Sequence, residues 1–153
     1  MDRKVLVRMH AGFGTLALLL ILSFFTSTVV VELQGDITQI QMVKRYIVYG
    51  IGLLAPAMAV TGFTGTKLSG KSRARLIQQK KNRMKRIMML GVAVLIPAAF
   101  LLNYLAQFNA FGMLFYSVQA VELVAGAANI FLMGLNMKEG FMLSGRIIRK
   151  QKA

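Results

Sequence analysis

The chain of 153 residues contains no cysteine and no tryptophan, and it has a single histidine. The lack of cysteine excludes disulfides, thiolate metal sites and a cysteine nucleophile. A lone histidine excludes a metal site built from several histidines of one subunit. Acidic residues are also scarce, with 5 Asp and Glu against 19 Lys and Arg. A single copy therefore has few of the groups from which enzymes build their active sites.

The chain is rich in long apolar runs, and 56% of its residues are hydrophobic. That share is too high for an ordinary soluble domain. Four stretches of about 20 residues have the length that crosses a bilayer as a helix. We predict an all-α polytopic membrane protein, a single up-down bundle of four transmembrane helices. Its spans are Met9–Val31, Tyr46–Thr66, Ile87–Gln107 and Met113–Asn136.

The basic residues between the spans predict the orientation, since cytoplasmic loops are enriched in Lys and Arg. Glu32 and Asp36 fall in the first loop, with Lys44 and Arg45 where the second span begins. A basic loop (67–86) and a basic tail (138–153) follow. Seventeen of the 19 basic residues lie on one side if both termini are cytoplasmic. We therefore expect cytoplasmic termini and a multi-pass protein of the bacterial inner membrane.

The basic loop contains no proline and has Ser72 as a candidate N-cap, so we expect it to extend the third span as a helix. No aromatic residues interleave its charges, which argues against nucleic acid. Binding of anionic lipid headgroups is the simplest function for such a loop. The residues predicted to bind headgroups are Lys71, Arg73, Arg75, Lys80, Lys81, Arg83, Lys85 and Arg86.

The two prolines, Pro56 and Pro97, each lie about ten residues into a predicted span. Proline removes a backbone donor and clashes with the preceding turn, so both helices should kink near mid-bilayer. Paired broken helices occur in transporters. Proline is also common in membrane helices generally, which favours ordinary packing.

The fourth span carries a polar stripe on one helical face, at intervals of three and four residues. Glu122 is its only charge and lies about 14 Å from the outer end of the span, too deep to reach the headgroups. The stripe should therefore face the bundle or another subunit. Either a neutral Glu122 bonds beside Gln119 and Asn129, so that Glu122→Gln is tolerated, or Glu122 carries protons. The stripe comprises Gln119, Glu122, Gly126, Asn129, Met133 and Asn136.

His10 opens the first span and is followed by small residues that would let a flat macrocycle approach the backbone. Histidine is the usual axial ligand of b-type haem, and the second ligand would be Met133, Met137 or His10 of a second subunit. The four-span layout with a histidine at the first helix resembles small cytochrome-b-like or copper-resistance-type bacterial membrane proteins. Their additional histidines have no counterpart in this chain.

We expect a non-catalytic subunit or accessory factor of a membrane complex, acting through helix–helix contacts as a homo-oligomer or within a larger assembly. Two alternatives remain open. One is a small oligomeric transporter or proton-coupled carrier that uses Glu122. The other is a haem b redox subunit that uses His10. We expect no metal site.

Overall fold

The structure is a computed structural model that describes residues 2–70 and 75–143, and within these ranges all regular structure is helical. Four of its helices are long and apolar enough to cross a membrane. These findings confirm the all-helical prediction with four candidate spans. The elements are α1 (Arg3–Gln34), α2 (Ile37–Ser69), α3 (Arg75–Met89), the π-helix η1 (Leu90–Leu95), α4 (Ile96–Gln107) and α5 (Met113–Leu143).

The connection between α1 and α2 is only two residues long. Gly35 adopts a left-handed conformation with φ of 68° and caps α1 by donating its N–H to the Val31 carbonyl. Asp36 then caps α2, because its carboxylate accepts the Thr38 N–H at 2.9 Å. The helices therefore continue through most of the predicted first loop. The placement of Glu32 in that loop is wrong, since Glu32 belongs to the last turns of α1.

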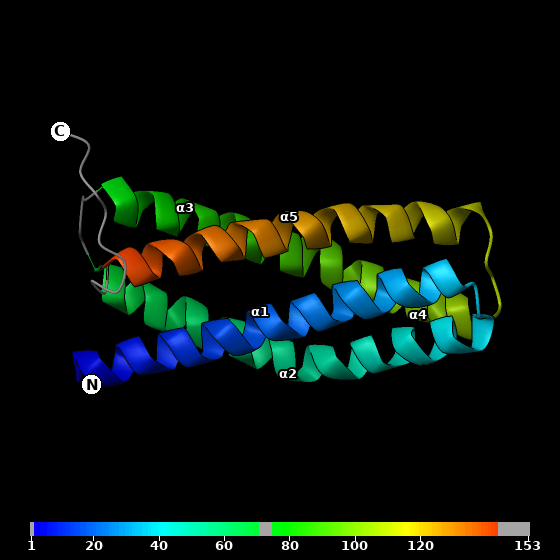
Figure 1. The fold of residues 1–153 in the computed structure, drawn as a ribbon, viewed down its shortest axis with the longest axis horizontal. Helices are drawn as coiled ribbons and strands as arrows, with labels where there is room; N and C mark the ends of the chain where they lie inside the picture. Colours follow the sequence, from blue (N-terminus) through cyan, green and yellow to red (C-terminus); the bar gives the residue numbers. More distant parts are fainter. Residues whose placement is uncertain (1, 71–74, 144–153) are drawn as a thin grey trace.

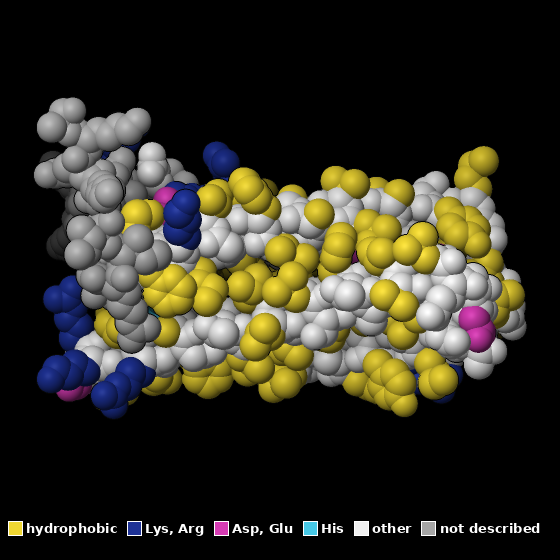
Figure 2. Space-filling model, in the orientation of Figure 1, with side chains coloured by type: hydrophobic (Ala, Val, Ile, Leu, Met, Phe, Trp, Pro, Cys, Tyr) yellow, Lys and Arg dark blue, Asp and Glu magenta, His cyan; other side chains and the backbone are white. Residues whose placement is uncertain are grey.

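The helices alternate in direction around the bundle (Figure 1). α1 packs against α2 and α5, and the third span, formed by α3, η1 and α4, packs against the same two helices. The α1–α2 and α4–α5 connections lie at one end, while the start of α1 and the end of α2 lie at the other. Figure 2 shows hydrophobic side chains along the length of the bundle and Lys and Arg gathered mainly at the end with the N-terminus.

The two prolines are accommodated in different ways. α2 continues as an α-helix through Pro56. In the third span the helix widens before Pro97, and the Ile96 N–H bonds to the Gly91 carbonyl five residues earlier. Proline has no N–H and its ring crowds the preceding turn, which explains a π segment at this position. The third span thus changes its winding in the middle of the bundle.

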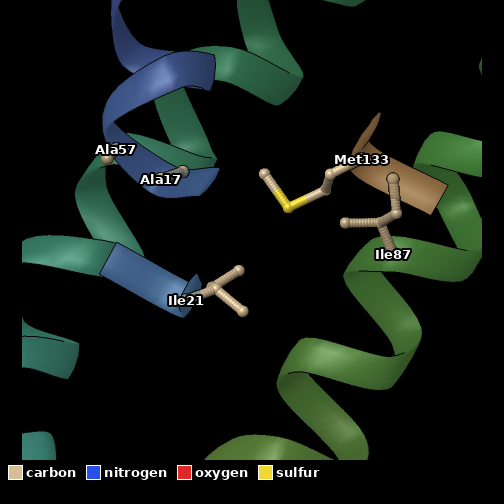
Figure 3. Close-up of a cluster of buried hydrophobic side chains, with 5 residues drawn as sticks. All are labelled: Ala17, Ile21, Ala57, Ile87 and Met133. Atoms are coloured by element: carbon tan, nitrogen blue, oxygen red, sulfur yellow. The ribbon is translucent and has the colours of Figure 1, made fainter. Parts of the chain in front are cut away.

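Two apolar clusters hold the bundle together. Figure 3 shows the first, in which α1, α2, α3 and α5 contribute Ala17, Ile21, Ala57, Ile87 and Met133. The second lies toward the end with the short connections and comprises Val31, Ile40, Leu102, Ala106 and Phe115. Four buried polar residues of α1, α2 and α5 fall between these two clusters along the chain: Thr28, Lys44, Gln119 and Asn129. The other three, Thr61, Thr64 and Asn136, lie beyond the first cluster.

Candidate functional site

A buried ion pair joins α2 to α5. The Lys44 ammonium donates to Glu122 Oε2 at 2.7 Å, and the two side chains are 0% and 13% exposed. Gln119 donates its Nε2 to the same oxygen at 3.0 Å. Charges inside a membrane protein are stable when they are paired and hydrogen-bonded in this way. Glu122 therefore faces the bundle of its own chain, and its partner is a lysine rather than Asn129.

A second carboxylate belongs to the same charged cluster. Glu32, near the end of α1, interacts electrostatically with both Lys44 and Glu122. Its Oε1 atom is buried and has no hydrogen-bond partner among the described residues. Glu32, Lys44 and Glu122 thus form a charged cluster of two acidic residues and one basic residue, in which only Glu122 is bonded to the lysine.

The rest of the polar stripe also faces inward. Gln119, Asn129 and Asn136 are buried, and Gly126 packs so close to α1 that an added Cβ would lie 3.3 Å from Phe25 Cδ2. Asn129 Oδ1 and Asn136 Oδ1 have no hydrogen-bond partner within the described chain. Met133 lies in the first apolar cluster. The residues of the stripe therefore face the interior of their own chain's bundle.

A cavity of about 220 Å³ lies beside the ion pair. All four spans contribute to its wall, which is apolar except for Thr28, Glu122 and Asn129. The wall also includes Gly91 and Val92 of the π segment. Engineered apolar cavities of about 150 Å³ hold a benzene molecule. This cavity is therefore large enough for a compact organic molecule.

His10 lies against α2 near the other end of the bundle. Its Nδ1 donates to the Thr61 carbonyl at 3.0 Å and lies 3.2 Å from Thr64 Oγ1. Gly65 makes room for the ring, because a Cβ there would lie 3.0 Å from His10 Cε1. These contacts give His10 a packing function between α1 and α2. Its function as a haem ligand stays a prediction.

The residues predicted to bind lipid headgroups differ in their surroundings. Arg75, Lys85 and Arg86 are exposed on α3. Arg83 instead forms an ion pair with Glu139 of α5, and Lys81 donates to the Gly70 carbonyl at 3.2 Å. Lys80 is half-buried, with its Nζ 3.3 Å from the position of a Cβ on Gly140. Lys71 and Arg73, like the candidate cap Ser72, lie outside the described residues.

Reasoning from the sequence missed Lys44 as the partner of Glu122. The sequence does contain a signal for this partner, because Lys44 stands between Ile40 and Ile47 at helical spacing. All three residues are buried on one face of α2. The predicted second span begins at Tyr46, which places Lys44 just outside it, whereas α2 already begins at Ile37. A charge in an apolar stripe, together with one carboxylate in a facing span, predicts a buried pair.

Comparison of the chain with protein-family models, with curated proteins and with solved structures finds no match.

Proposed function

We propose that this protein is a non-catalytic subunit of a bacterial inner-membrane assembly, formed with copies of itself through α1. Both termini are placed in the cytoplasm, where the exposed basic residues of α3 bind anionic headgroups. The observation that carries the proposal is a shallow hollow on α1, with three hydroxyl-bearing residues among apolar ones. We call this surface the α1 face, and it is lined by Leu19, Leu22, Ser23, Thr26, Ser27, Val30 and Val31.

The composition of the α1 face suits a helix more than it suits lipid. Ser23 and Thr26 are exposed in the middle of a span, where lipid tails offer their hydroxyl groups no partner. Ser23 and Ser27 are small residues four positions apart, the spacing at which a second helix can approach closely. Leu19 and Val30, 56% and 45% exposed, border the hollow along the helix. A helix laid along this face would bury both the hydroxyls and the flanking apolar side chains.

A second copy of the chain is the simplest source of that helix, since most oligomers are symmetric assemblies of identical subunits. The chain has no cysteine, so a single Ser23→Cys substitution provides a clean test by oxidative cross-linking in membranes. We expect a disulfide-linked dimer. Val124→Cys is the matched control, because Val124 is 73% exposed on α5 and lies outside the α1 face.

Equal cross-linking of the Ser23→Cys and Val124→Cys proteins would indicate random collision and contradict the proposal. A Ser23→Cys protein that stays monomeric under oxidation would contradict it as well.

The charged cluster favours a second candidate, a proton-coupled carrier. Its support is the excess of acidic residues, because the cluster holds Glu32 and Glu122 but only one basic residue, Lys44. The test is proton uptake into vesicles containing the purified protein under an imposed membrane potential. The double variant Lys44→Met with Glu122→Gln removes both charges of the ion pair, leaves Glu32 in place and keeps an acceptor for Gln119. If the wild type takes up protons and this double variant does not, the carrier becomes the better-supported function.

A further inference from the structure

The cavity between the spans opens sideways, toward the lipid. Its wall includes residues of both α2 and η1, yet no Cα atom of η1 lies within 8 Å of α2 in the described chain. Ala55 and Ala59 of α2 and Val92 of η1 line the cavity and are exposed. The small side chains of the two alanines leave this gap wide. The gap between α2 and η1 is therefore the candidate entrance for a molecule dissolved in the bilayer.

The wall offers a hydrogen-bond acceptor that the chain itself does not use. Asn129 lines the cavity, is 1% exposed, and its Oδ1 has no partner among the described residues. Buried carbonyl groups almost always have a hydrogen-bond partner, and leaving one unpaired costs free energy. Thr28 Oγ1, also on the wall, is likewise buried and unpaired there. The remaining lining, apart from Glu122, is apolar.

We propose that this cavity binds a compact, membrane-dissolved apolar molecule that carries a hydroxyl group. The molecule enters between α2 and η1, places its apolar body against the wall and donates its hydroxyl to Asn129 Oδ1. The volume of about 220 Å³ accommodates an alkylated ring, since about 150 Å³ holds benzene. This ligand site is separate from the α1 face and does not depend on assembly.

Thymol and p-cymene are suitable probes, because they share one carbon skeleton and differ by the hydroxyl group. The measurement is the thermal unfolding of the purified protein in detergent, followed by far-UV circular dichroism. A ligand present at about ten times its Kd should raise Tm by roughly 3–5 °C. We expect thymol to reach that rise in the wild type and p-cymene to give a smaller one.

Two variants locate the effect. Asn129→Leu keeps a similar volume and removes the acceptor, so thymol and p-cymene should then raise Tm equally. Ala55→Leu narrows the opening and should reduce the effect of both probes. Ala93→Leu is its matched control, because Ala93 is exposed in the same region of the bundle and does not line the cavity.

The proposal is overturned if thymol leaves the wild-type Tm unchanged or if the preference for thymol survives Asn129→Leu. It is also overturned if thymol acts equally on Ala55→Leu and Ala93→Leu, since the probe would then act through the micelle. If Asn129→Leu does not fold, the comparison of Ala55→Leu with Ala93→Leu still shows whether thymol binds in the cavity. Thymol binding by a monomeric Ser23→Phe protein would show that the ligand site stands even where assembly fails.

Discussion

Lys44 and Glu122 are 78 residues apart in the chain, and their side chains meet at 2.7 Å inside the bundle. α2 and α5 lie diagonally opposite each other, and no Cα atoms of the two helices come within 8 Å in the described chain. The long lysine side chain therefore crosses the interior to reach the carboxylate. This ion pair is a direct link between two helices whose backbones stay apart.

Breaking the pair from either side should destabilise the protein strongly. Lys44→Met removes the bonded partner of the Glu122 carboxylate, and Glu122→Gln removes that of the Lys44 ammonium, so each should cost about 3–5 kcal/mol. The double variant should cost much less than the sum of the two, because neither charge of the pair remains without the other. Reversible unfolding in mixed micelles measures all three free energies.

Tolerance of Glu122→Gln was expected from the sequence, on the assumption of a neutral carboxyl group. The pairing with Lys44 reverses that expectation. Additive costs in the double variant would show that the two groups do not interact and would favour a neutral Glu122 instead.

Two glycines of α2 provide a test of helix packing. A Cβ on Gly50 would overlap the Phe24 ring of α1, whereas a Cβ on Gly52 would meet nothing within 4 Å. Gly50→Ala should therefore cost about 1–3 kcal/mol through overpacking, while Gly52→Ala should gain up to about 1 kcal/mol from helix propensity. Thermal unfolding of the two variants side by side gives the comparison. Equal Tm values would count against the close approach of α1 and α2.

The basic residues of α3 should separate into two functions. Arg83→Gln removes the ion pair with Glu139 and should lower Tm with little effect on lipid affinity. Lys85→Gln, at an exposed position, should instead weaken the binding of anionic lipid and leave Tm nearly unchanged. Native mass spectrometry with anionic and zwitterionic lipids measures the affinity. Loss of anionic lipid from Arg83→Gln alone would reverse these assignments.

The orientation in the membrane can be tested by thiol labelling, since the chain has no cysteine of its own. A membrane-impermeant reagent should label Asn109→Cys in intact cells, because residue 109 lies in the α4–α5 connection. Lys85→Cys should react only after the membrane is opened. Labelling of Lys85→Cys in intact cells would reverse the proposed topology.

Hydrophobic run length was enough to predict the spans, because the bilayer sets that length directly. It did not predict where the helices end. Gly35 caps the end of α1 and Asp36 caps the start of α2. The polar residues on either side of these two caps therefore belong to the helices and not to a loop. Asn129 and Gly126 of the predicted polar stripe both line the cavity. The partner of Glu122 required knowledge of which helices face each other across the bundle, and a single sequence does not contain that arrangement.

Assembly through α1 is tested most directly by the mass of the detergent-solubilised protein, measured by sedimentation equilibrium after correction for bound detergent. The wild type should sediment at a multiple of the chain mass of 16.9 kDa, and Ser23→Phe should sediment as a monomer with an unchanged helical spectrum. Val124→Phe, on the exposed face of α5, should match the wild type. A monomeric wild type, or a Ser23→Phe protein that keeps the wild-type mass, would contradict the proposed function.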